Sequence, residues 1–84
     1  RNLYRGIRHP QVTLLQQFLA KNPLLYPQGL VTGYFGSLTE AAVKKFQAKY
    51  NIVSSGTPNS TGYGRVGPRT RAKLNELYNT VPSP

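Results

Sequence analysis

The side chains of this 84-residue chain that could do chemistry are tyrosines and arginines in its loop-like stretches. Tyr26, Tyr34 and Tyr63 stand in segments rich in Pro, Gly, Ser and Thr. A tyrosine ring can stack on a sugar or a base while its hydroxyl forms a hydrogen bond. Arg65 and Arg69 follow Tyr63, and a guanidinium can hold a carboxylate or phosphate through two parallel hydrogen bonds. These five residues predict a site that binds an anionic or ring-bearing ligand.

The acid–base residues are too few for the common enzyme mechanisms. His9 is the single histidine, the only carboxylates are Glu40 and Glu76, and there is no cysteine. A zinc site needs three or four such ligands, and no spacing argues that the two glutamates flank a substrate cleft. The run GYGRVG resembles a phosphate loop only loosely, because no hydrophobic strand precedes it. We therefore expect no catalysis, no cofactor and no metal, and a capping or surface role for His9.

The charge of the chain favours anionic partners. Eleven Lys and Arg against two acidic residues give a formal net charge of +9. Such a chain attracts nucleic acid, anionic lipid or an anionic cell-wall polymer, and the basic residues are too evenly spread to choose among them. We expect no membrane span, because no run of about 18 apolar residues occurs.

Three segments with helical spacing of apolar residues must position these side chains. The first follows Pro10 and ends before Pro23, the second begins near Ser37, and the third begins at Pro68. Their apolar positions are, in turn, Val12, Leu15, Phe18 and Leu19; Leu38, Ala42, Val43, Phe46 and Tyr50; and Leu74, Leu77, Tyr78 and Val81. The pattern predicts an all-α fold, a compact three-helix bundle with two long loops over 23–36 and 51–67.

The first of these loops carries several apolar residues, and we expect it to pack back onto the helices. Those residues are Leu24, Leu25, Leu30, Val31 and Phe35.

One phrase occurs twice, as GYFGSLTEAAVKKFQ at residues 33–47 and as GRVGPRTRAKLNELY at residues 64–78. In both copies two glycines are separated by two residues, and a threonine and a helical pattern follow. Glycine permits positive φ and close backbone approach, so each pair predicts a tight turn that directs Phe35 or Val66 into the core. The phrase is thus an internal half-motif duplication, and most of it is expected to be architectural.

The alignment of the two copies also predicts how the second and third helices begin. Gly67 precedes Pro68, a residue suited to the first helical position, so Gly36 and Gly67 are the expected N-caps. In the first copy Ser37 is an alternative N-cap, with Glu40 three residues later.

A larger set of positions carries a resemblance to a known family. These are the L-x-x-G run at Leu3 to Gly6, Leu15-Gln16, Gly33, Phe35-Gly36, Thr39, Ala42-Val43, Phe46-Gln47, Gly67 and Thr70. Over about Leu3 to Leu77 the chain resembles the peptidoglycan-binding domain family, the type-1, three-helix cell-wall module. The family often has Gly where His9 stands, and the stretch SSGTPNSTGYG is longer than the family's usual turn.

The resemblance implies a non-catalytic module that anchors a larger exported protein to murein, in the cell wall, outside the cell or in the periplasm. The ligand would be the glycan or the stem peptide of peptidoglycan. We expect a shallow groove near the two glycine turns, where backbone amides at the helix N-termini also attract anions. In it Tyr26, Tyr34 and Tyr63 would offer stacking faces, and Arg65 and Arg69 donors.

The first residue, the composition of the tail and the same resemblance together predict how the protein is organised. Since the chain begins with Arg1 rather than Met, we expect a module of a longer protein that carries a cell-wall hydrolase or peptidase domain. Residues 1–79 would form the domain, a monomer, and residues 80–84 the start of a Pro/Ser linker or a disordered tail.

Two other functions stay open at this stage. A basic three-helix domain could place its third helix, with Arg69, Arg71 and Lys73, in a DNA major groove. Against this, Asn75 is the only obvious base-reading side chain of that helix, and the loops are long. The second is a protein-interaction module with no wall ligand.

Overall fold

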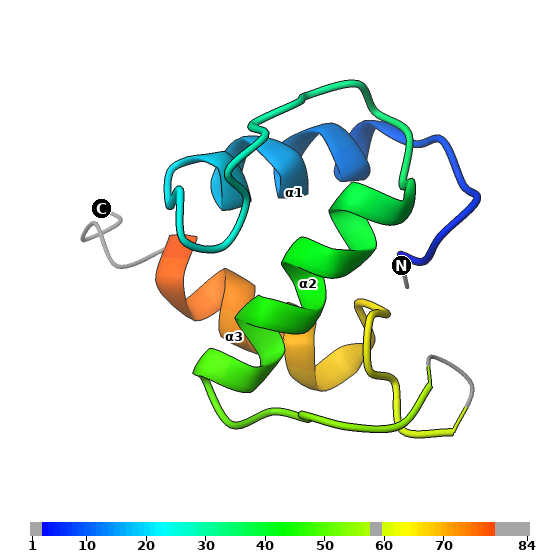
Figure 1. The fold of residues 1–84 in the computed structure, drawn as a ribbon, viewed down its shortest axis with the longest axis vertical. Helices are drawn as coiled ribbons and strands as arrows, with labels where there is room; N and C mark the ends of the chain where they lie inside the picture. Colours follow the sequence, from blue (N-terminus) through cyan, green and yellow to red (C-terminus); the bar gives the residue numbers. More distant parts are fainter. Residues whose placement is uncertain (1–2, 58–59, 79–84) are drawn as a thin grey trace.

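Three helices build the fold in the computed structural model, which describes residues 3–57 and 60–78. They are α1 (Pro10–Ala20), α2 (Ser37–Lys49) and α3 (Pro68–Tyr78). Figure 1 shows α2 running diagonally between α1 and α3, with the two long loops on the outside. The predicted all-α, three-helix fold is confirmed. The predicted tail and the apolar position Val81 lie outside the described residues.

The helix α1 begins at a capped end and buries one apolar stripe. His9 is its N-cap, and the Nδ1 atom of His9 accepts a hydrogen bond from the Gln11 backbone N–H at 3.1 Å. This bond satisfies one of the donors that a helix start leaves free. The capping role predicted for His9 is therefore confirmed. Val12, Leu15 and Leu19 are buried, as their spacing predicts.

Both glycine turns direct one apolar side chain inward just before a helix. Phe35 and Val66 are fully buried. In each turn the first glycine needs its conformational freedom, because φ is +82° at Gly33 and +94° at Gly64. A side chain on Gly64 would also come within 3.0 Å of Glu40 Cγ on α2.

The second glycine of each pair begins the following helix. Gly36 is the N-cap of α2, which confirms the alignment over the alternative start at Ser37. The carbonyl of Gly67 accepts the first helical bond of α3, from the Arg71 N–H at 2.9 Å. The two copies of the phrase thus start their helices in the same way.

Two buried glutamines hold the two turns in place. Gln16 on α1 donates from Nε2 to Thr39 Oγ1 at 3.0 Å and accepts from the Gly33 N–H at 2.9 Å. Gln47 on α2 donates from Nε2 to Thr70 Oγ1 at 3.0 Å and accepts from the Gly64 N–H at 2.7 Å. Buried backbone groups need partners of this kind when no strand supplies them. Thus α1 fixes the start of α2, and α2 fixes the start of α3.

The segment of residues 3–9, which precedes α1, pairs with both turns. Leu3 and Val66 exchange backbone bonds of 3.1 and 2.7 Å. Further along, the Gly6 N–H donates to the Phe35 carbonyl at 2.8 Å, and the Phe35 N–H donates to the Ile7 carbonyl at 2.9 Å. In Figure 1 the start of the chain, in blue, accordingly lies near the turn before α3, in yellow. This segment thus spans the distance between the two glycine turns.

The loop of residues 23–36 packs against the helices less completely than expected. Leu25 and Tyr26 are buried, but the side chain of Leu24 is 81% exposed, and Leu30 and Val31 are also exposed. The Leu25 and Tyr26 N–H groups both donate to the Asn22 carbonyl, which closes a turn directly after α1. That turn directs two successive side chains inward and leaves Leu24 outside. The expectation is therefore wrong for Leu24, Leu30 and Val31.

Candidate binding surface

Tyr26, predicted to offer a stacking face, is part of the core. Its side chain is only 2% exposed, and its hydroxyl donates to the Leu30 carbonyl at 2.6 Å. A buried tyrosine hydroxyl needs an acceptor, and the Leu30 carbonyl supplies it. The ring therefore supports the middle of the first loop from inside. The expectation that Tyr26 offers an open face is therefore wrong.

Tyr34, in the first glycine turn, is exposed and carries a cation over its ring. Its side chain is 43% exposed. The guanidinium carbon of Arg8 lies 5.4 Å from the ring centroid, within the range of a cation–π contact. Backbone pairing of Arg8 with Tyr34 holds the two residues side by side. The first turn thus presents an aromatic ring and a guanidinium together.

Arg65, in the second glycine turn, forms a similar pair with Tyr4. Its guanidinium carbon lies 5.6 Å from the Tyr4 ring centroid, and Tyr4 is 43% exposed. The bridge between Leu3 and Val66, the neighbours of these two residues, aligns them. Each turn therefore contributes one member of an Arg–Tyr pair, and the segment of residues 3–9 contributes the other.

The other two predicted residues lie around the second turn. Tyr63 is half-buried, and Lys44 Nζ lies 5.3 Å from its ring centroid. Arg69 is exposed in the first turn of α3 and lines a small hollow of about 140 Å³ together with Arg65. The structure thus brings Tyr63, Arg65 and Arg69 to one turn and leaves Tyr34 at the other.

We call Tyr4, Arg5, Arg8, Tyr34 and Arg65 the Tyr/Arg surface, because the segment of residues 3–9 carries three of them and forms backbone bridges to Tyr34 and to Val66, the neighbour of Arg65. Arg5 lies 3.7 Å from Glu40 and keeps 60% of its side chain exposed. Glu40 keeps only 16% of its side chain exposed, so Arg5 reaches from the surface toward a half-buried carboxylate.

Tyr4 and Arg8 were not predicted as site residues from the sequence. The signal that could have indicated them is the run LYRGIR at residues 3–8, where two arginines follow a tyrosine.

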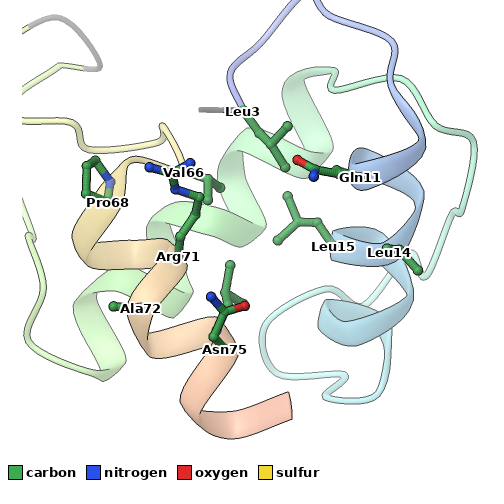
Figure 2. A pocket seen from close by; sticks show the side chains of 10 residues that line it. Leu3, Gln11, Leu14, Leu15, Val66, Pro68, Arg71, Ala72 and Asn75 are labelled. Carbon is green, nitrogen blue, oxygen red and sulfur yellow. The ribbon is translucent and has the colours of Figure 1, made fainter. Parts of the chain in front are cut away.

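A larger, open groove lies between α1 and α3, next to the second turn. Its volume is about 830 Å³. Figure 2 shows Gln11 and Leu15 extending from α1 and Arg71 and Asn75 from α3, with Leu3 at one end. This groove differs from the one expected near the two glycine turns, because it adjoins only the second turn and no predicted site residue lines it.

The described residues were compared with two further kinds of feature, a metal-binding group and a membrane-spanning helix. Over 3–57 and 60–78, no three His, Cys, Asp or Glu side chains come together in a group that could hold a metal ion. In the same ranges no helix has the length and apolar character needed to cross a membrane.

Comparison with known proteins assigns the family. The family described as "Putative peptidoglycan binding domain" matches residues 8–74, which is most of the chain. Neither the curated proteins nor the solved structures include a match. The matched range contains all three helix starts, both glycine turns and both buried glutamines. The chain therefore belongs to the peptidoglycan-binding domain family.

Proposed function

We propose that this chain is a non-catalytic module that anchors a larger exported protein to peptidoglycan through the Tyr/Arg surface. The observation that carries the proposal is the pairing of Arg8 with Tyr34 and of Arg65 with Tyr4 in a chain of this family. Peptidoglycan offers sugar rings in its glycan and carboxylates in its stem peptides. Aromatic faces suit the first of these groups, and guanidinium donors suit the second.

The Arg–Tyr pairs prepare the surface for a ligand before it binds. A guanidinium stacked over a ring has an already ordered side chain, and its terminal N–H groups can still donate, although the Nε atom of Arg65 is buried. Binding then requires less loss of side-chain freedom than it would with an unrestrained arginine. The net charge of +9 adds a general attraction to the carboxylates of the wall. Tyr63 and Arg69 extend this surface around the second turn.

The arrangement of α3 favours the wall over DNA. Arg71 lines the groove toward α1, whereas Lys73 Nζ lies 5.2 Å from the ring centroid of Tyr50, at the end of α2. Lys73 also lies 3.4 Å from Glu76. Two of the three cations proposed to enter a major groove thus face different neighbours. A recognition helix would direct them to one side.

Sedimentation with purified, insoluble peptidoglycan tests the proposal. We expect the 84-residue chain to sediment with the wall at low salt and to be released progressively as salt rises, because salt screens exposed charges. A chain that stays in solution even at low salt contradicts the proposal. Duplex DNA in a mobility-shift assay is the comparison. Nucleic-acid binding would instead be favoured if the dissociation constant for DNA were lower than that for the wall and rose steeply with salt.

The same proposal places the module in the cell wall or the periplasm, joined to a hydrolase or peptidase domain and acting as a monomer. In this arrangement the module raises the local concentration of the joined domain on its polymeric substrate. Fusion of the chain to a fluorescent protein, followed by binding to isolated cell walls, measures this retention directly. The fluorescent protein alone should remain unbound.

A further inference from the structure

The groove between α1 and α3 differs in chemistry from the Tyr/Arg surface. Leu3, Leu15, Val66 and Leu74 are buried core residues that also line it, so its floor is apolar. Leu14, at its edge, keeps 56% of its side chain exposed. Each of the four floor side chains is no more than 8% exposed, so the floor is the outer edge of the core. Its volume of about 830 Å³ is in the range of small-ligand sites.

Three polar side chains stand around this apolar floor. Gln11 extends from α1, and Arg71 and Asn75 extend from α3 (Figure 2). The two amides can donate to and accept from a peptide backbone, and the guanidinium can hold a carboxylate. Among the described residues, neither Asp nor Glu lines the groove. The groove is therefore complementary to a ligand that is partly apolar and carries negative charge.

The part of the groove that the structure describes has no aromatic ring in its lining. This indicates which of the two components of peptidoglycan, glycan or stem peptide, each site suits. Proteins commonly hold a sugar ring against an aromatic face, and the Tyr/Arg surface offers such faces at Tyr4 and Tyr34. A peptide with small apolar side chains needs no such face. It needs an apolar floor, amide partners and a counter-charge, which are the features of this groove.

We propose that the α1–α3 groove binds the stem peptide of peptidoglycan, with a peptide carboxylate at Arg71 and the peptide backbone at Gln11 and Asn75. This inference rests on the proposed function and assigns the peptide to the groove, while the glycan contacts the Tyr/Arg surface. The two sites meet at Leu3 and Val66, which form a bridge between the segment of residues 3–9 and the second turn and also line the groove.

Nuclear magnetic resonance titration of the 84-residue chain tests the assignment without any substitution. The probes are a synthetic stem peptide with free carboxylates and peptide-free glycan strands. We expect the stem peptide to shift the Leu14 methyl signals and the Ala72 and Asn75 amide signals, and the glycan strands to shift the Tyr4 and Tyr34 signals. A stem peptide that leaves the groove signals unmoved overturns the inference.

Two substitutions with matched controls measure the contribution of the groove. Arg71→Gln removes a cation from the groove, and Lys45→Gln removes one from an exposed position of α2. Ala72→Glu places a carboxylate in the groove, and Ala48→Glu places one on exposed α2. We expect each groove variant to weaken stem-peptide binding about tenfold and each control less than about twofold. Equal losses in variant and control overturn the inference, because net charge alone would then explain binding.

Two outcomes separate this inference from the proposed function. If the chain binds whole peptidoglycan and binds amidase-treated, peptide-free glycan equally well, the groove assignment is wrong and the proposed function stands. If the chain binds neither, both are wrong. Groove signals that move with protein concentration rather than with peptide would identify an interface between two copies of the chain, and this also overturns the assignment.

Discussion

Gln16 and Gln47 make the same bonds in two successive parts of the chain. Each is separated by 23 residues from the threonine that accepts its Nε2 bond, Thr39 or Thr70. Each is separated by 17 residues from a glycine whose N–H it accepts. Each also donates to a carbonyl 18 residues onward, that of Tyr34 or Arg65. In both places a glutamine on one helix thus holds the glycine turn and the threonine with which the next helix begins, and Gln47 is itself the last residue of the first copy of the phrase.

Loss of either glutamine is expected to destabilise the fold. In Gln16→Leu or Gln47→Leu an apolar side chain replaces the partner of buried backbone N–H and carbonyl groups, which then lack hydrogen bonds. We expect each variant to lower the free energy of unfolding by about 2–4 kcal/mol. Urea denaturation followed by circular dichroism measures this. Gln17→Leu, at an exposed neighbouring position of α1, is the control and should change stability by less than about 0.5 kcal/mol. Equal effects at 16 and 17 would contradict the role given to Gln16.

The first glycine of each turn should resist substitution, whereas Gly67 should accept it. Gly33→Ala and Gly64→Ala force a side chain into positive φ, and at Gly64 the new Cβ would also crowd Glu40 and Lys44. We expect a loss of about 1–3 kcal/mol of unfolding free energy for each. Gly67→Ala is the control, because its φ is not positive and a Cβ there would meet open space. Thermal unfolding of the three variants makes the comparison. A Gly67→Ala variant as unstable as Gly64→Ala would refute this explanation.

Tyr26 is expected to matter for stability and not for wall binding. Tyr26→Phe removes the hydroxyl that donates to the Leu30 carbonyl and leaves the buried ring in place. We expect a loss of about 1 kcal/mol of unfolding free energy, with unchanged retention on peptidoglycan. Tyr34→Phe, at an exposed position, should change stability by less than about 0.5 kcal/mol. If a folded Tyr26→Phe variant were retained less well on peptidoglycan, Tyr26 would belong to the binding site after all.

Substitutions in the Tyr/Arg surface should weaken binding to peptidoglycan more than the loss of one charge elsewhere does. Arg8→Gln and Tyr34→Ala break the Arg8–Tyr34 pair from its two sides. Arg69→Ala removes an exposed cation beside the second turn. We expect each of the three to raise the dissociation constant for insoluble peptidoglycan about three- to tenfold. Lys45→Gln removes the same charge as Arg8→Gln from an exposed position of α2 and should have less than half that effect. Retention that falls equally in both glutamine variants would show attraction by net charge without a defined site.

Much of the scaffold could be predicted from local patterns. Pro10 and Pro68 begin the first and third helices, and Gly36 caps the second, as predicted. Phe35 and Val66 are buried where the glycine pairs predict. These features depend on neighbouring residues and on their backbone dihedral preferences, and both can be read from the residue types alone. Leu38 shows the limit of this reasoning, because it has the spacing of the α2 stripe but stays 40% exposed.

The sequence by itself determined the three helices, the N-cap of α2, the inward residues of the two turns and the basic character of the chain. The tertiary structure decided which side chains share a surface. Tyr26 is buried and Tyr34 is exposed, although both lie in one loop, because only the first lies in the turn that folds onto α1. Tyr4 and Arg8 join the site through backbone pairing with turns far along the chain. A local pattern indicates which face of a segment is apolar. Which distant segment then covers or extends that face depends on how the whole chain packs.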